Sequence, residues 1–263
     1  MDLQLTGKQA LITGSTAGIG YAIAAGLARE GARVIITGRT QARVDEALGS
    51  LLADTGVLGQ GFAGDLGDAA VCAALATTYP DVDILVNNLG IFETKAFEDI
   101  PDADWLRFFE VNVMAGVRLA RACLPAMRRR DWGRIVFISS ESAINIPAEM
   151  VHYGMTKTAQ LAVSRGLAES LAGTGITVNS VLPGPTRSRG VVEFLAKMAA
   201  EAGQPVADIE REFFNRARPS SLIKRFAEPA EIAAMVTYIV SPLASATTGA
   251  ALRVDGGIVR NPF

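Results

Sequence analysis

The sequence is poor in residues that bind metals or form disulfides. It has one histidine and two cysteines among 263 residues. Cys72 and Cys123 are isolated, with no CxxC spacing and no histidine cluster near them. This pattern indicates neither a zinc site nor a disulfide framework, and we expect both thiols to be buried and inert.

Long apolar runs and a basic charge excess are also missing. No apolar run approaches the ~18 residues of a membrane span, and the first nine residues, MDLQLTGKQ, contain no apolar core of a signal peptide. The formal net charge is −2, and the basic run at 128–131 is too short to form a nucleic-acid surface. We therefore expect a cytoplasmic protein with neither a membrane nor a nucleic-acid partner.

Apolar runs of strand length instead alternate with segments of helical period. Hydrophobic residues make up 49% of the chain and charged residues 20%, which is typical of a globular protein with a large core. The expected strands are 10–13, 33–37, 59–63, 83–87, 134–139, 176–182 and 251–255. The expected helices are about 19–30, 41–54, 69–78, 102–129 and 151–172. This alternation predicts an α/β fold with a parallel sheet covered by helices on both faces.

One segment differs in composition from the rest of the chain. Residues 188–229 are helical in period, richer in charge and aromatic residues, and lie between two expected strands. No linker, low-complexity tract or internal repeat divides the chain. We therefore predict one domain over residues 1–263.

A glycine-rich turn, TGSTAGIG at 13–20, joins the first expected strand to the first helix. Gly14 permits a tight turn, Gly18 allows a pyrophosphate to approach the backbone, and Gly20 allows close packing of helix on strand. The alternative is a tight turn that is only structural. Its place between a first strand and a helix favours a nucleotide site.

Tyr153 and Lys157 stand four residues apart in the expected helix 151–172, so both side chains project from one helix face. A phenol beside an ammonium is suited to proton transfer, although such a pair also occurs at ordinary helix surfaces. Ser140, at the end of the fifth expected strand, is a third candidate, and its neighbour Ser139 is an alternative to it. His152, the only histidine, points to a different helix face from Tyr153, and we predict that it lies at the surface or in an interface.

These motifs together resemble the short-chain dehydrogenase/reductase family over essentially the whole chain. The family's order and spacing are matched by the glycine pattern of Gly14, Gly18 and Gly20, and by GDL at 64–66, NNLG at 87–90, VNV at 111–113, Ser140, the YxxxK pair, PGP at 183–185 and DGG at 255–257. The resemblance implies a single-domain Rossmann-type, doubly wound fold with a seven-stranded parallel sheet. It also implies a substrate lid at about 188–226.

The resemblance further implies an NAD(P)-dependent oxidoreductase that interconverts a ketone or aldehyde and an alcohol. Tyr153 would be the general acid/base, with a pKa lowered by Lys157 and by the oxidised nicotinamide. Ser140 would hold the substrate oxygen, and Asn112 would order a proton-carrying water chain or, alternatively, cap or kink its helix. The implied cofactor residues are Gly14, Ser15, Thr16, Gly18, Ile19, Gly20, Arg39, Asp65, Leu66, Asn88, Gly90, Tyr153, Lys157, Pro183, Gly184 and Thr186.

Two positions bear on the choice and fit of the cofactor. Gly38 stands where NAD-using members carry Asp, and Arg39 follows it, which favours NADP(H) over NAD(H) because Arg pairs bidentately with a phosphate. The alternative is that Arg39 is only an exposed loop residue without a role in binding. Leu89 replaces the family's alanine and is expected to shift the adenosine half slightly.

Substrate and assembly are less constrained by the sequence. The apolar stripe of the 188–226 segment favours a mostly apolar ketone or alcohol, unless the stripe serves packing or subunit contact; it consists of Val191, Val192, Phe194, Leu195, Met198, Ile209, Phe213 and Phe214. Glu141, Glu149 and Arg187 are unassigned polar candidates. A 3-oxoacyl-thioester (acyl-carrier-protein) reductase is an alternative, with a basic patch of Arg187, Arg189, Lys224 and Arg225, and a non-catalytic nucleotide-binding regulator is another. The resemblance implies a homotetramer, or a homodimer, with contacts from the long fourth and fifth helices and residues 255–263.

Overall fold

The predicted strands form one parallel sheet. The structure is a computed structural model that describes residues 1–262, apart from the side chains of Arg189 and Phe194. The strand order is β3-β2-β1-β4-β5-β6-β7, and all neighbouring strands run parallel. The strands are β1 (Gln9–Ile12), β2 (Arg33–Gly38), β3 (Gln60–Ala63), β4 (Ile84–Asn87), β5 (Gly133–Ile138), β6 (Ile176–Pro183) and β7 (Ala251–Val254). The predicted single-domain, doubly wound α/β fold is confirmed.

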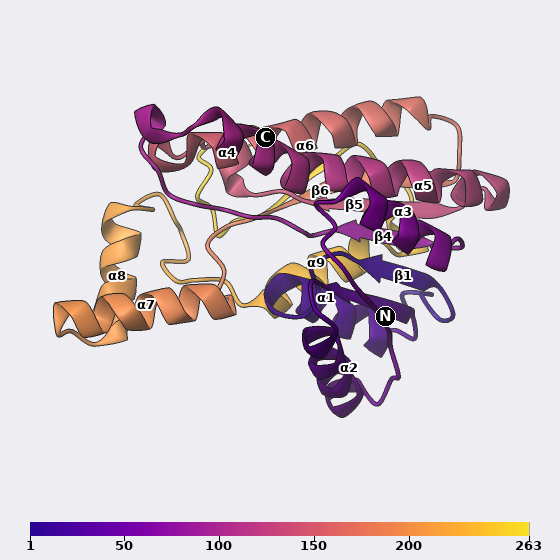
Figure 1. Ribbon diagram of the computed structural model, residues 1–263, viewed down its shortest axis with the longest axis horizontal. Coiled ribbons are helices and arrows are strands. Elements are labelled where there is room, and N and C mark those ends of the chain that lie inside the picture. Colours follow the sequence, from indigo (N-terminus) through magenta and orange to yellow (C-terminus); the bar gives the residue numbers. More distant parts are fainter. Residues whose placement is uncertain (263) are drawn as a thin grey trace.

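Helices cover both faces of the sheet (Figure 1). The first group, which packs against one face, is α1 (Gly18–Arg29), α2 (Gln41–Thr55) and α9 (Pro229–Ile239). The second group, on the opposite face, is α3 (Ala69–Thr78), α5 (Ala115–Arg130) and α6 (Val151–Ser170). The remaining helices are α4 (Asp102–Phe109), α7 (Arg189–Ala202) and α8 (Val206–Arg216), with short 3-10 turns η1 (Phe97–Asp99), η3 (Glu141–Ala143), η4 (Ala148–Met150) and η5 (Pro242–Ala244).

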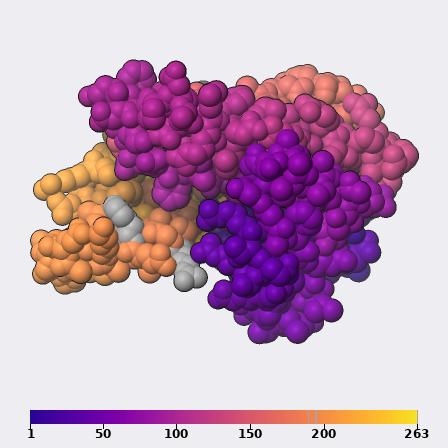
Figure 2. Space-filling view, in the orientation of Figure 1, coloured from indigo at the N-terminus to yellow at the C-terminus, as the bar shows by residue number. Residues whose placement is uncertain are grey.

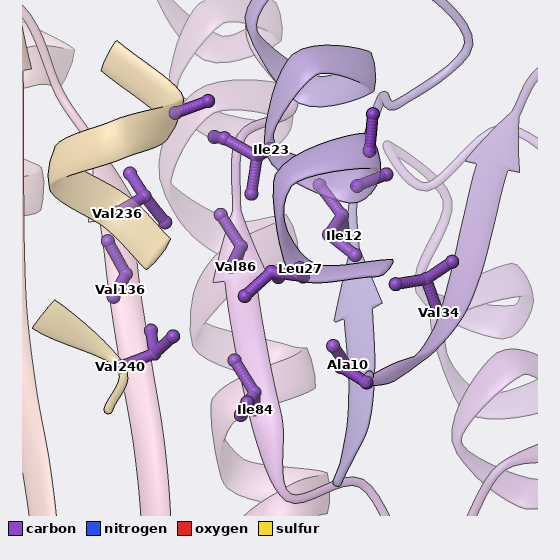
Figure 3. Close-up of a cluster of buried hydrophobic side chains, with 14 of the residues drawn as sticks. Ala10, Ile12, Ile23, Leu27, Val34, Ile84, Val86, Val136, Val236 and Val240 are labelled. Carbon is purple, nitrogen blue, oxygen red and sulfur yellow. The ribbon is translucent and has the colours of Figure 1, made fainter. Parts of the chain in front are cut away.

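The core follows the alternation of side chains along the strands. Ala10 and Ile12 of β1 pack on the side of α1 and α9, whereas Leu11 packs on the side of α3 and α5. Figure 3 shows the first of these clusters, where Ile23 of α1 and Val236 of α9 meet the central strands. A fully buried side chain of this size stabilises the fold by about 1.5–3 kcal/mol, so these layers fix the positions of the strand ends. Cys72 and Cys123 are buried in the second cluster, as expected.

The long fourth helix is continuous but not uniform. A π-helical turn, η2 (Glu110–Met114), separates α4 from α5. Such turns are single wide turns that are frequent at functional sites. Asn112 lies within this turn and is 2% exposed, so the helix irregularity and the candidate residue coincide.

The strand order reverses between β1 and β4. Sheet neighbours β2 and β3 extend to one side of β1, and β5, β6 and β7 extend to the other side of β4. In open parallel sheets the connections that leave the carboxyl ends at such a point diverge and create a crevice. The glycine turn after β1 and residues 88–90 after β4 both lie at this point.

The prediction that His152 lies at the surface or in an interface is wrong. Its side chain is fully buried within the chain, with its ring centroid 4.1 Å from that of Phe108 and 6.0 Å from that of Trp105. Neither ring nitrogen has a hydrogen-bond partner among the described residues. The reason is the tight packing of α6 against α4, which turns this helix face inward, and burial lowers the pKa of the imidazole below its ordinary value.

This burial predicts a pH-dependent loss of stability. Because the folded-state pKa of His152 is depressed, the unfolded chain takes up the proton first as the pH falls through about 6.5. The free energy of unfolding should therefore decrease below that pH. Chemical unfolding at pH 7.5, 6.0 and 5.0 should show a steeper decrease for the wild type than for His152→Leu. At pH 7.5 the variant should be more stable by about 1 kcal/mol, since it buries no unpaired nitrogen. Parallel pH dependences would contradict this prediction.

Candidate active site

The glycine turn forms a backbone cradle at the start of α1. Gly14 and Gly18 have φ angles of +60° and +58°, which residues with a Cβ rarely adopt. A Cβ on Gly20 would lie 2.5 Å from Nδ2 of Asn88 and 2.6 Å from the carbonyl oxygen of Gly14, so only glycine fits there. The N-cap residue Ala17 supplies no side-chain cap, and the first turn carries no acidic residue. The free N–H groups and the positive helix end fit the pyrophosphate of a dinucleotide.

Hydrogen bonds from β4 hold this turn in place. Nδ2 of Asn88 donates to the carbonyl oxygens of Thr13 and Gly14 at 2.9 and 3.0 Å. Oγ1 of Thr13 accepts from the N–H groups of Asn88 and Leu89, both at 2.9 Å. The hydroxyl of Ser15 is engaged elsewhere: it donates to the carbonyl of Ile12 and accepts from a β2 N–H. Asn88 thus positions the turn, and Ser15 has only its backbone to offer a ligand.

The end of β2 is shaped by a close contact. A Cβ on Gly38 would lie 2.5 Å from Cγ2 of Thr16, so the acidic side chain of NAD-using relatives does not fit here without rearrangement. The next residue, Arg39, is exposed. Within the described part of the chain its guanidinium has no hydrogen bond or ion pair. A cation beside a small residue leaves room for a phosphate group on the ribose.

The other candidate cofactor residues line the same edge of the sheet. Asp65 is exposed and accepts a hydrogen bond from the N–H of Gly67 at 3.0 Å, while Leu66 is buried. Leu89 is half-buried and packs against the core cluster that contains Leu66, so its added bulk is directed at least partly into the protein. Pro183 ends β6 and is followed by Gly184. The hydroxyl of Thr186 donates to the carbonyl of Gly184 at 2.9 Å, and Ile19 follows Gly18 in the first turn of α1.

Tyr153 and Lys157 share one face of α6 beside the end of β5. Nζ of Lys157 lies 5.6 Å from the ring centroid of Tyr153. The hydroxyl of Ser140 interacts with the phenol strongly enough to lower its pKa, whereas the hydroxyl of Ser139 donates to the carbonyl of Lys157 at 2.9 Å. Of the two serines, therefore, only Ser140 faces the phenol.

The protein groups shift the pKa of Tyr153 in the opposite direction from the one expected. Burial raises it to about 12, the Ser140 hydroxyl lowers it, and the charge of Glu141 raises it. Lys157 is not among the groups that cause this shift, and its ammonium donates to the carbonyl of Ile138 at 2.9 Å. At neutral pH the phenol is therefore protonated, as an ordinary tyrosine is, and its proton is available to a substrate oxygen.

Gln160, which the motif analysis missed, links Lys157 to Asn112. Oε1 of Gln160 lies 3.3 Å from Nζ of Lys157, and its Nε2 donates to the carbonyl of Asn112 at 2.5 Å. Nδ2 of Asn112 in turn donates to Oγ1 of Thr156 and to the carbonyl of Ile91. Gln160 follows Tyr153 by seven residues and Lys157 by three, so the helical period places all three on one face. This spacing is the sequence feature from which the contact could have been predicted.

Lys157 is buried without a carboxylate partner among the described residues. Lys157 is 4% exposed, and burial lowers the pKa of its ammonium to about 8. A Cβ on Gly90 would lie 3.3 Å from its Nζ and 3.6 Å from Oδ1 of Asn112. Gly90, Asn112 and Lys157 are therefore brought together, and the ammonium relies on neutral acceptors.

Helices α7 and α8 stand out from the body on the side of α4 and α6 (Figure 1). Figure 2 shows a recess between the surface near α4 and that of α7 and α8. Most of the apolar stripe expected to face a substrate is used for packing: Leu195, Ile209 and Phe214 are buried in a separate cluster with Ala199 and Phe226, and Val191 and Phe213 pack against it. Phe194 is outside the described side chains, and Val192 and Met198 are exposed.

The proposed basic patch is largely neutralised within the chain. Arg187 binds Glu210 through two hydrogen bonds of 2.8 and 2.9 Å and Glu228 through one of 3.0 Å. Arg225 pairs with Glu231 at 2.7 Å. Nζ of Lys224 donates to the carbonyl of Pro219, and the side chain of Arg189 lies outside the described residues. These contacts fasten the α7–α8 segment to α9 and leave little free positive charge for an acidic carrier.

The described residues also bear on two other kinds of site. No group of three or more His, Cys, Asp or Glu side chains there is able to hold a metal ion. No described helix is long and apolar enough to cross a membrane.

Comparisons with known proteins agree with this geometry. The profile of a family described as enoyl-(acyl carrier protein) reductase matches residues 14–259. The uncharacterized oxidoreductase YvaG of Bacillus subtilis is 50% identical over 266 residues, which cover all of both chains. The 3-oxoacyl-[acyl-carrier-protein] reductase FabG of Aquifex aeolicus is 32% identical, over 98% of this chain and all of the relative. The crystal structure of L-sorbose reductase from Gluconobacter frateurii, complexed with NADPH and L-sorbose, superposes with a TM-score of 0.94 at 32% identity, over 99% of this chain and all of that one.

The Gln160 bridge predicts an effect on the pKa of Lys157. In Gln160→Leu the ammonium loses an acceptor that favours its charged form, so its pKa should fall below that of the wild type. In the matched variant Gln160→Glu a negative charge takes the same place, and the pKa should rise. The chain has five lysines, so ¹³Cε-lysine NMR titrations can be assigned with a Lys157→Arg variant. Equal midpoints in all three proteins would show that Gln160 does not act on the ammonium.

Proposed function

Because the chain belongs to the short-chain dehydrogenase/reductase family of oxidoreductases, we propose that it is an NADP(H)-dependent enzyme interconverting a ketone or aldehyde and an alcohol. The observation that carries this proposal is the grouping of Ser140, Tyr153 and Lys157 at the strand ends beside the glycine cradle. A regulator that only binds nucleotide would have no need for this grouping. The crystal structure of the L-sorbose reductase with NADPH, at a TM-score of 0.94, supports the choice of cofactor.

We propose that reduction proceeds with Tyr153 as the proton donor. Its hydroxyl, protonated at neutral pH, gives its proton to the carbonyl oxygen of the substrate, and the hydroxyl of Ser140 hydrogen-bonds the same oxygen. The nicotinamide, when bound, supplies the hydride. The Lys157 ammonium would bind the ribose of the nicotinamide, and Gln160 and Asn112 keep that ammonium in place.

Binding of the cofactor is assigned to the edge of the sheet. The backbone of Gly14, Gly18 and Ile19 would receive the pyrophosphate, and Arg39 the 2′-phosphate of NADP(H). Asp65 and Leu66 would lie at the adenine, Lys157 at the nicotinamide ribose, and the turn from Pro183 to Thr186 at the carboxamide. Asn88 and Gly90 would line the cofactor between these ends. NAD(H) remains the second candidate cofactor.

A 3-oxoacyl-thioester reductase is the second candidate function, favoured by the likeness to the reductase of Aquifex aeolicus. The pairing of Arg187 and Arg225 with acidic residues weighs against it, because an acidic carrier needs free positive charge. We also propose a homotetramer, with a homodimer as the alternative, whose contacts come from α4 and α5, from α6 and from residues 255–263. Leu106 and Phe109 of α4 are 71% and 38% exposed, which suits a subunit contact.

Replacing Tyr153 tests the catalytic assignment. In Tyr153→Phe the ring packing is kept and the transferable proton is lost, so kcat for ketone reduction should fall about 10²–10⁴-fold. Binding of NADPH, measured by fluorescence titration, should be nearly unchanged. A variant that keeps wild-type turnover would exclude Tyr153 as the proton donor.

Replacing Arg39 tests the cofactor assignment. A hydrogen-bonded charge pair contributes about 1.5–3 kcal/mol, so Arg39→Ala should weaken NADPH binding by about 10- to 100-fold. The affinity for NADH should stay within about 2-fold, because NADH carries no 2′-phosphate for the guanidinium to bind. Tighter binding of NADH than of NADPH by the wild-type protein would refute the assignment.

A further inference from the structure

An ion pair lies directly beside the proposed catalytic group. Glu141 follows Ser140 in the chain, begins η3 and is 3% exposed. Nε of Arg218, which follows α8, donates to its Oε1 at 3.0 Å. The pair therefore joins the end of β5 to the chain that follows α8.

The second carboxylate oxygen of Glu141 is unused. Oε2 is buried and has no hydrogen-bond partner among the described residues. An ionised carboxylate accepts hydrogen bonds at both oxygens, and leaving a buried acceptor unpaired is costly. Burial raises the pKa of this carboxyl, and the charge of Arg218 lowers it, with smaller effects of Asp255 and of the Ser142 hydroxyl. Such an orphaned acceptor in a site is a place where a ligand donor belongs.

The carboxylate is near the atoms that would react. Glu141 is the chain neighbour of Ser140, whose hydroxyl faces the Tyr153 phenol. The charge of Glu141 also raises the pKa of that phenol, and the charge of Arg218 lowers it. A substrate whose carbonyl oxygen meets Ser140 and Tyr153 therefore has its neighbouring carbons close to Glu141. Most of the apolar side chains of α7 and α8 are meanwhile packed against each other, which weakens the case for a mainly apolar substrate.

We propose that Oε2 of Glu141 accepts a hydrogen bond from a hydroxyl group of the substrate, so that the enzyme acts on hydroxylated ketones and the corresponding polyols. This inference rests on the proposed function of the same site. A neutral donor fits better than an ammonium group, because the guanidinium of Arg218 already balances the carboxylate and would repel a second cation. The second carboxylate at Arg218 is that of Glu149, 3.7 Å from its Nη1 and half exposed.

The test compares substrates that differ by one hydroxyl. NADPH oxidation is followed with 2-butanone, 1-hydroxy-2-butanone, 4-hydroxy-2-butanone, 1-amino-2-butanone and a ketohexose. For the wild type, kcat/KM should be at least about 10-fold higher for a hydroxylated ketone than for 2-butanone, as expected for a hydrogen bond to a charged acceptor. In Glu141→Gln this ratio should fall toward one. The ratio is the readout because the lost carboxylate charge also changes the pKa of Tyr153 and so acts on both ketones alike.

Controls separate this role from folding and from the proposed function. Glu149→Gln removes the other carboxylate at Arg218 and should keep the wild-type selectivity ratio. If Glu141→Gln fails to bind NADPH, the inference is tested by the wild type alone, through its ratio of kcat/KM for the hydroxylated ketones to that for 2-butanone. Equal turnover of 2-butanone and every hydroxylated ketone would overturn the inference and leave the proposed function intact. A preference for the amino ketone would also overturn it, because Glu141 would then bind a substrate ammonium group and not a hydroxyl. NADPH binding with no turnover of any ketone, the ketohexose included, would overturn both.

Discussion

The buried ammonium of Lys157 is the constraint on which the site depends. A cation without a carboxylate partner is costly to bury, and its depressed pKa of about 8 reflects that cost. The buried ammonium is stabilised by two neutral acceptors, the carbonyl of Ile138 and the side-chain amide of Gln160. Gln160 in turn donates a hydrogen bond to the carbonyl of Asn112 in the π-helical turn. A carboxylate in place of these acceptors would neutralise the ammonium and remove its positive charge from the site. The π-helical turn, the end of β5 and α6 are thus held in one arrangement by a single charge.

The sheet supplies the second requirement, a fixed distance between cradle and catalytic group. β1 and β4 are neighbours at the reversal of strand order, and Asn88 ties the loops that follow them together. β5 lies next to β4 and ends at the two serines, of which one anchors α6 and the other faces Tyr153. Buried apolar side chains on both faces keep these strands in register, so residues far apart in sequence meet without flexible connections.

The sequence predicted the parts of the molecule that follow from local pattern and composition. Strand and helix ranges, the single parallel sheet and the position of the glycine turn depend on periodicity and on short motifs, and they agree with the structure to within a few residues. The burial of His152 and the contact of Gln160 with Lys157 were not predicted. Their surroundings come from α4 and from the π-helical turn, which lie more than 40 residues away in the chain. The upward shift of the pKa of Tyr153 depends on burial in the folded chain, which no motif encodes.

The substrate is where a sequence pattern was most misleading. An apolar stripe at helical spacing on α7 and α8 fits both a lid over an apolar ligand and two helices that pack together, and the structure places most of it in the second role. The same helices are fastened by Arg187 to Glu210 and Glu228, and Arg218 beyond them reaches Glu141. Polar contacts therefore connect the α7–α8 segment to the site, and its apolar contacts hold the segment together. A site that includes the unpaired oxygen of Glu141 would discriminate ligands mainly by hydrogen bonds, because an unpaired buried acceptor rejects a molecule that lacks the matching donor far more strongly than an apolar wall rejects a slightly different shape.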